Sequence, residues 1–318
     1  MNNIPKAYAC YNNNLDIRMS STSGGIFTLI AEYVLEDLGG VVFGAAFDAD
    51  FNVQHICVDT IEKLGGLRGS KYPQSSLGTS YQKVKKFLLE GRTVLFSGTP
   101  CQVQGLKLYL GRDYDNLICI DFVCHGVASR GIWKDYVTWL KKKGIINNII
   151  FKSKVKGWKK WYFRVEYADK IYTHRGGMNS FMRSFLLYCN IRPSCYNCHF
   201  KGLNHNSEFT ISDCWGIGEQ NKELNDDKGL SALLIHNEKA NYIFDKIKSK
   251  ITYREYPAQT LMEGNWTAFE SVKPHSCRDD FFALYSKKGG VEAINYFFKP
   301  SIKNWLGYYK MRFLGKER

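Results

Sequence analysis

The sequence predicts a mixed α/β and α+β fold, in which an N-terminal α/β sheet unit has an α+β C-terminal part packed on it. Up to about residue 145, apolar strand-like runs alternate with helical spacing, as in sheets with crossover helices. Further on, two strand-like runs flank a basic Gly157-Trp158 turn, which is typical of antiparallel strands. The predicted parts are residues 1–145, residues 146–295 and a basic amphipathic tail at 296–318.

Hydrophobic periodicity predicts the individual elements. In the first part we expect strands at residues 6–11, 41–48, 53–58, 93–97 and 117–122. Helical spacing of apolar residues occurs at 26–35, 80–90, 102–110 and 132–143. In the second part we expect strands at 149–154, 161–167 and 209–212 and a helix at 180–189.

Composition and charge narrow the class of protein. The chain has 318 residues, of which 44% are hydrophobic, so it is long enough to bury a large core. No apolar stretch of about 18 residues occurs and the N-terminus lacks the order of a signal peptide, so we expect a cytoplasmic protein. The net charge of +14 attracts acidic partners such as nucleic acid, anionic lipid, an acidic redox protein or a polyanionic cofactor.

Two segments carry much of this positive charge. Lys141 to Lys160 contains eight Lys and no acidic residue, and the tail is basic as well. Either segment can be read more simply as a solvated basic face. In the tail, Trp305, Leu306 and Phe313 share one helical face, as in an interfacial membrane helix or a terminal helix packed on the domain. No recognised DNA- or RNA-binding motif is present, so we expect no nucleic acid partner.

Small polar residues occur at three points where ligands commonly bind. Ser20 to Gly25 directly precedes the helical spacing at 26–35, where free N–H groups favour a phosphate. The alternative is a plain helix cap after a flexible turn. Gly69-Ser70-Lys71 forms a second turn, and Gly98-Thr99 follows the strand at 93–97. Open α/β sheets bind ligands at the carboxyl ends of their strands.

The chain has ten cysteines and no secretion signal, which favours ligands, nucleophiles or buried residues over disulfides. Cys10, Cys57 and Cys119 lie within apolar runs, so we expect them to be small buried hydrophobes. The pattern assigns no role to Cys189, Cys214 and Cys277.

Cys195-x-x-Cys198 is the sharpest local signal, because two thiolates at this spacing can hold a zinc ion or an iron of a cluster. Zinc needs two further ligands, and His199 and His205 are nearby, although neither has the spacing of a zinc finger. The CxxC does not follow a strand at a helix start, so a thioredoxin-like site is not expected.

Cys101 and Cys124 each follow one of two consecutive strands, so their side chains can converge above the sheet. With Cys195 and Cys198 they make four thiolates, the number that a 4Fe-4S cluster takes. The alternative is that Cys101 is a turn residue after Pro100 and that Cys124 belongs to the core.

Six motifs in this order resemble the coenzyme F-420 hydrogenase/dehydrogenase beta-subunit family, over residues 6 to 290. They are Arg18 to Phe27, Arg68 to Tyr72, Leu95 to Gln102, Cys124 to Val127, Arg192 to Cys198 and Asp213 to Gly216. The resemblance implies an iron-sulfur flavoprotein that passes electrons between a cluster, a bound FAD and a second substrate.

The resemblance also implies the site residues. Cys101, Cys124, Cys195 and Cys198 match the cluster ligands. The residues expected around the flavin or its pyrophosphate are Ser23, Gly24, Gly25, Gly69, Ser70, Lys71, Gly98 and Thr99. Lys71 is expected to stabilise negative charge on the reduced isoalloxazine. His125 either relays a proton or donates a hydrogen bond to a cluster sulfur.

This sequence departs from the family pattern in two ways. Many members carry a ferredoxin-like module before the Ser-Gly-Gly helix, and this sequence starts after it, so we expect one cluster and a separate acidic electron carrier such as a ferredoxin. The basic segment from Lys141 to Lys160 suits docking with it. Cys214 stands where an apolar or aromatic residue is expected, so it is an alternative ligand.

The sequence therefore predicts a flavin-dependent oxidoreductase that passes electrons from a protein donor through a 4Fe-4S cluster to FAD and then to a small-molecule acceptor. The acceptor is expected to be deazaflavin-like or to belong to a surface-polysaccharide pathway. The alternative is a non-enzymatic basic protein with a structural zinc at the CxxC, which binds a polyanion or, through its tail, the inner face of a membrane.

Overall fold

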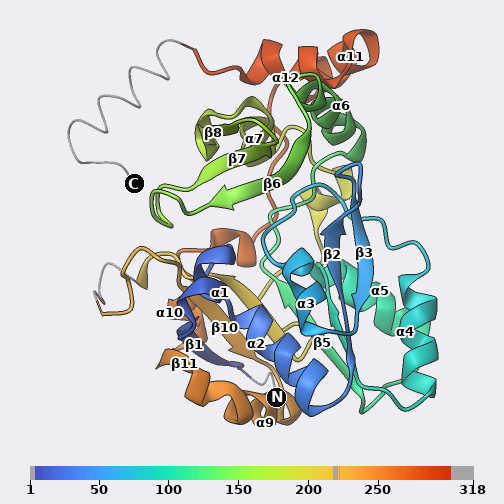
Figure 1. Cartoon of the computed structure of the whole chain (residues 1–318), viewed down its shortest axis with the longest axis vertical. Coiled ribbons are helices and arrows are strands. Elements are labelled where there is room, and N and C mark those ends of the chain that lie inside the picture. Colours follow the sequence, from blue (N-terminus) through green and yellow to red (C-terminus); the bar gives the residue numbers. More distant parts are fainter. Residues whose placement is uncertain (1–3, 218–220, 222, 302–318) are drawn as a thin grey trace.

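The computed structural model describes residues 4–217, 221 and 223–301. Its centre is an eight-stranded sheet with the order β11-β1-β10-β9-β5-β4-β2-β3 (Figure 1). The strands are β1 (Lys6–Asn12), β2 (Val41–Phe47), β3 (Val53–Val58), β4 (Val94–Ser97), β5 (Leu117–Phe122), β9 (Phe209–Asp213), β10 (Ser231–Ile235) and β11 (Ile251–Tyr256). The mixed α/β architecture that the sequence predicts is confirmed.

The sheet combines strands from both ends of the chain. Strands β2, β4, β5 and β9 are parallel in its middle, while β3, β10, β1 and β11 pair antiparallel at the two sides. Because β9 pairs with β5 and β10 pairs with β1, the sheet is completed only by the late strands. The boundary predicted between residues 145 and 146 therefore falls within the chain segment that builds this sheet, because β1 to β5 precede it and β9 to β11 follow it.

Helices cover both faces of the large sheet. On one face, α2 (Ile26–Glu32), continued by the π-helix η1 (Tyr33–Asp37), shares a hydrophobic core with α9 (Glu238–Ile247). On the other face, α4 (Ser80–Leu89) and α5 (Pro100–Leu110) share a second core. Strand β5 alternates accordingly: Ile118 and Ile120 face the first core and Cys119 faces the second. Cys10 and Cys119 are buried as expected, whereas Cys57, on edge strand β3, is only half-buried.

A smaller unit lies above one edge of the large sheet (Figure 1). Its antiparallel sheet contains β6 (Ile146–Ser153), β7 (Tyr162–Tyr167) and β8 (Ile171–Arg175), as the sequence predicts for the first two strands. Around it lie α6 (Arg130–Lys141), α7 (Ser180–Leu186), α11 (Arg278–Lys288) and α12 (Gly290–Phe298). Aromatic side chains dominate its core, among them Trp133, Phe151 and Phe163. The remaining helices are the short α1 (Leu15–Ser20), α3 (Ile61–Leu64) and α10 (Ala258–Met262).

The basic segment from Lys141 to Lys160 is not simply a solvated face. Lys152 and Lys154 are buried, because the end of β6 with Lys152, and Lys154 directly after it, pack against the larger part of the molecule. The other lysines of the segment are exposed. The predicted amphipathic tail lies almost wholly outside the described residues. Within residues 4–301, no described helix has the length and apolar character needed to cross a bilayer.

Replacing Gly24 by Ala should destabilise the fold, because Gly24 packs closely against the neighbouring strands β1 and β10. An added Cβ would lie 2.5 Å from the carbonyl oxygen of Cys10 and 2.9 Å from the amide nitrogen of Ser231. We expect Gly24→Ala to lower the free energy of unfolding by about 1–3 kcal/mol, as overpacking does, measured by urea denaturation. Gly177→Ala is the control, because an added Cβ there meets no atom within 4 Å. Equal stabilities would contradict this close packing.

Candidate functional site

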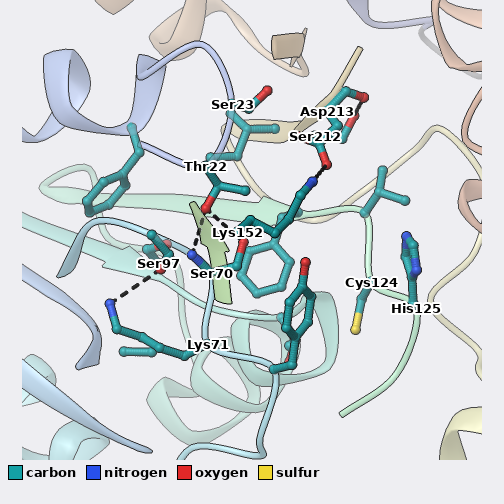
Figure 2. A pocket seen from close by; sticks show the side chains of 18 of the residues that line it. Thr22, Ser23, Ser70, Lys71, Ser97, Cys124, His125, Lys152, Ser212 and Asp213 are labelled. Carbon is teal, nitrogen blue, oxygen red and sulfur yellow. Dashed lines mark hydrogen bonds and ion pairs between the residues drawn. The ribbon is translucent and has the colours of Figure 1, made fainter. Parts of the chain in front are cut away.

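A cavity of about 370 Å³ lies where the carboxyl ends of the parallel strands meet the smaller unit (Figure 2). Ser97 and Phe122, at the ends of β4 and β5, line one side, and Lys152 and Trp161 of the smaller unit line another. The volume is within the usual range for cofactor and small-molecule sites. The sequence-predicted residues among its lining are Ser23, Gly25, Gly69, Ser70, Lys71, Gly98, Thr99, Cys124 and His125.

The two loops predicted to surround a flavin contact each other at this cavity. The Thr22 hydroxyl oxygen accepts a hydrogen bond from the Ser70 amide (2.7 Å) and lies 3.0 Å from the Ser70 hydroxyl (Figure 2). Behind them, Gly24 donates its N–H to the Ser231 hydroxyl at 2.8 Å, so Gly24 anchors the loop between α1 and α2 on β10. The residues from two distant motifs therefore form one continuous wall.

Lys154, from the smaller unit, binds α1 and the loop between α1 and α2. Its ammonium donates to the carbonyl oxygens of Arg18 (2.7 Å), Ser23 (2.5 Å) and Lys228 (2.7 Å). These three bonds use all three N–H donors of a lysine. Burial lowers the pKa of Lys154 to about 7. A substitution of Lys154 should therefore change the conformation of the loop between α1 and α2, which lines the cavity.

The ammonium of Lys71 binds its own loop. It donates to the carbonyl oxygens of Gly66 (2.9 Å), Arg68 (2.8 Å) and Gly69 (3.3 Å). Burial lowers the pKa of Lys71 to about 7. Gly69 has a φ of +81°, a backbone conformation that favours glycine and allows the loop to wrap around the ammonium. In this arrangement Lys71 shapes the loop and adds positive charge to the cavity wall.

An ion pair that the sequence does not predict lines the opposite wall. The Lys152 ammonium lies 2.6 Å from the Asp213 carboxylate, and both side chains are largely buried. Burial opposes the charge of Lys152, but the Asp213 carboxylate outweighs it and raises the lysine pKa. Trp158 and Trp215 stack at 4.3 Å beside the pair, and the Trp158 indole donates to Asp213. The only sequence signal is a lysine within an otherwise strand-like run.

Cys124 and His125 lie side by side at the end of β5 (Figure 2). Burial raises the pKa of Cys124 to about 12, although the Gly126 amide donates to its sulfur at 3.4 Å. Burial lowers the pKa of His125, so its imidazole is neutral at pH 7. A neutral imidazole has one nitrogen that donates and one that accepts, so it can hold or move a proton.

The structure brings the four predicted cluster cysteines into one region. Cys101 is exposed in the first turn of α5, and the Thr99 hydroxyl lies 3.1 Å from its sulfur. The thiols of Cys195 and Cys101 raise the pKa of Cys124 in addition to burial. The thiol of Cys198 raises the pKa of Cys195 in the same way. An added Cβ at Gly126 would lie 3.2 Å from Cys195 Cβ, so the loop after β5 touches the CxxC loop.

Of the alternative ligands His199, His205 and Cys214, the last two have other neighbours in the structure. His205 lies 2.9 Å from both carboxylate oxygens of Asp121, on β5. Cys214 is buried in a hydrophobic cluster with Trp158 and Leu230. Among the described residues, no three His, Cys, Asp or Glu side chains are gathered closely enough to hold a single metal ion.

Comparison with known proteins identifies the family. The family model for the carboxyl-terminal region of the coenzyme F420 hydrogenase/dehydrogenase beta subunit matches residues 91–259, which is just over half of the chain. The chain belongs to this family. The matched range of the F420 hydrogenase/dehydrogenase beta-subunit family runs from β4 to the start of α10 and includes the four cysteines predicted to hold a cluster, Lys152 and Asp213. Membership associates the chain with redox subunits of hydrogenases and dehydrogenases.

A solved structure shows the same fold. A chain of the xenon-derivatised F420-reducing NiFe hydrogenase complex from Methanosarcina barkeri superimposes with a TM-score of 0.54 at 16% sequence identity. The match covers 90% of this chain and 89% of that one. No curated protein matches the sequence.

Replacing Lys152 by Met should strongly destabilise the protein, because it leaves the buried Asp213 carboxylate without its cation. We expect a loss of about 3–5 kcal/mol in the free energy of unfolding, measured by urea denaturation. The double variant Lys152→Met/Asp213→Asn removes both charges and retains an acceptor for the Trp158 indole, so it should regain more than half of that loss. A double variant that is no more stable than Lys152→Met would contradict the pairing.

Proposed function

We propose that this protein is an iron-sulfur flavoprotein oxidoreductase, which passes electrons from a protein donor through a 4Fe-4S cluster to FAD and then to a small-molecule acceptor. The observation that carries the proposal is the convergence of the Thr22–Ser70 wall, Gly98-Thr99 and Cys124-His125 on one cavity. Membership of a family of hydrogenase and dehydrogenase beta subunits supports it.

Cys101, Cys124, Cys195 and Cys198 would hold the cluster. They come from three segments, the start of α5, the end of β5 and the CxxC loop, and neighbouring thiols of the set raise the pKa of Cys124 and of Cys195. A set of four thiols with no carboxylate is the usual ligand set of a 4Fe-4S cluster. When bound, the cluster exchanges single electrons and the flavin exchanges electron pairs, which connects a one-electron donor to a two-electron acceptor.

The cavity residues would bind the flavin. Ser23, Gly25 and Ser70 line one wall with small side chains, and Gly69, Gly98 and Thr99 lie beside them. Gly24 supports this wall from behind. Lys71 and the Lys152–Asp213 pair supply charge on two sides of the cavity. His125, neutral at pH 7 and next to Cys124, is placed to hold a proton for the acceptor or to donate a hydrogen bond to sulfur.

A deazaflavin-like molecule is one candidate acceptor, since the similar fold occurs in an F420-reducing complex. A substrate of a surface-polysaccharide pathway is the other candidate. We place this reaction in the cytoplasm.

The donor would be an acidic carrier such as a ferredoxin, docking where the cluster is nearest to solvent. Cys101 is exposed, which places that edge of the site at the surface. Arg192 is exposed beside Cys195, and its charge lowers the pKa of that thiol against the effect of burial. The exposed lysines at 141–143 add attraction over a longer range.

Charge reversal at Arg192 should slow reduction by an acidic ferredoxin. We expect Arg192→Glu to lower the second-order rate constant about tenfold at low ionic strength, measured by stopped-flow absorbance, with the difference closing as NaCl is added. Lys246→Glu, which makes the same charge change on α9, is the control. Equal slowing by both variants would contradict docking at Arg192.

Metal and flavin content test the proposal directly. Protein purified without oxygen should contain about four irons and four sulfides per chain together with FAD, measured by chemical analysis and visible absorption. Cys195→Ser should lose most of the iron, whereas Cys57→Ser, which changes a half-buried cysteine on edge strand β3, should keep it. A single zinc, or neither metal nor flavin, would overturn the proposal and favour the basic binding protein.

A further inference from the structure

Cys189 and Cys277 form a thiol pair outside the proposed cluster. Cys189 follows α7 and is fully buried, while Cys277 is the residue before α11 and is half-buried. The two residues belong to the same hydrophobic cluster, and each thiol acts on the pKa of the other. Two cysteines from distant parts of the chain are thus held side by side with no disulfide between them.

A histidine lies directly beside the more accessible thiol. The His275 Nδ1 atom is 3.1 Å from the Cys277 sulfur, and the Cys277 backbone N–H points to the same nitrogen at 3.3 Å. Because a backbone N–H can only donate, Nδ1 carries the lone pair. The same nitrogen can therefore accept the thiol proton, which is the arrangement of an activated cysteine nucleophile.

Hydrogen bonds hold the two segments together around the thiols. Arg278, next to Cys277, donates both to the carbonyl oxygen of Cys189 and to the hydroxyl of Tyr196 (2.7 Å). That hydroxyl donates to the carbonyl oxygen of Tyr188 at 2.5 Å. Burial raises the pKa of both thiols, but Cys277 is half-buried and contacts His275, whereas Cys189 is fully buried. The pair is therefore asymmetric in access, with Cys277 as the nucleophile and Cys189 as the buried partner.

We propose that Cys277 and Cys189 are a redox-active dithiol that hydrogen peroxide converts into a disulfide. The Cys277 thiol gives its proton to His275, and its sulfur attacks one peroxide oxygen. The S–O bond forms, the O–O bond breaks, and the leaving hydroxide takes up a proton to become water. The Cys189 sulfur then attacks Cys277, so that the S–S bond forms, the S–O bond breaks and a second water leaves. The two thiols lose two electrons and the peroxide gains them.

This modification is separate from the proposed electron path. None of its three residues lines the cavity, and none is a proposed cluster ligand. The disulfide would join the start of α11 to the segment that leads into the CxxC loop. Its formation can therefore be followed whether or not the protein holds a cluster.

Mapping the oxidised cysteines tests the proposal. The full-length protein, prepared without oxygen, is treated with a slight excess of hydrogen peroxide, alkylated under denaturing conditions and digested for mass spectrometry. We expect a linked pair of peptides containing Cys189 and Cys277 to appear before Cys57 is oxidised. Cys277→Ser should leave Cys189 reduced. Cys189→Ser should stop the reaction at a Cys277 sulfenic acid, which dimedone captures.

The rate of disulfide formation tests the part played by His275. His275→Gln should give the same linked peptides at least about tenfold more slowly, because the proton acceptor is lost. The unsubstituted protein decides the proposal even if a variant fails to fold. It is overturned if no linked pair forms, or if Cys57 is oxidised as fast as Cys277.

Discussion

The three hydrogen bonds of the Lys154 ammonium hold together the parts of the molecule that build the cavity. They join the residue after β6 to α1 at Arg18, to the loop between α1 and α2 at Ser23, and to the segment before β10 at Lys228. Those segments come from the N-terminal, middle and late parts of the chain. An added Cβ at Gly229 would lie 2.4 Å from the ammonium, so the neighbouring backbone is closely fitted to it. The shape of the ligand-facing loop thus depends on a charge inside the protein.

Part of the positive charge of this chain therefore acts inside the protein. Lys71, Lys152 and Lys154 all lie at or next to the cavity, and their N–H donors have different acceptors. Lys71 donates to carbonyls of its own loop, Lys152 to a carboxylate, and Lys154 to carbonyls from three segments. Buried cations of this kind are tolerated only when their donors are used. Because burial lowers the pKa of Lys71 and Lys154 to about 7, each is charged in about half of the molecules at pH 7, while Asp213 balances the charge of Lys152. The Ser and Gly residues of the cavity wall suit a phosphate-containing cofactor.

Local sequence patterns predict much of the fold because they depend on neighbouring residues. The apolar run at 117–122 and the helical spacing at Ile26, Leu29 and Ile30 are reproduced in the structure as β5 and α2. Long-range pairing could not be predicted, since nothing near β1 indicates that β10 and β11 would enclose it. The Lys152–Asp213 pair was missed for the same reason: its partners are 61 residues apart, and each is unremarkable alone.

The cysteine site shows which non-local contacts a sequence can predict. Strands β4 and β5 are parallel neighbours with Ser97 opposite Ile120, so the chain leaves both strands at the same edge. Cys101 and Cys124 follow those exits, and their convergence follows from strand order and direction alone. The CxxC loop arrives differently, through the bridge between Ala128 and Ile191 and the bond from the Arg192 amide to the Val127 carbonyl. That contact depends on how the smaller unit packs, so the ligand count of a 4Fe-4S cluster and the likeness to a family, and no rule of strand order, joined Cys195 and Cys198 to the other two.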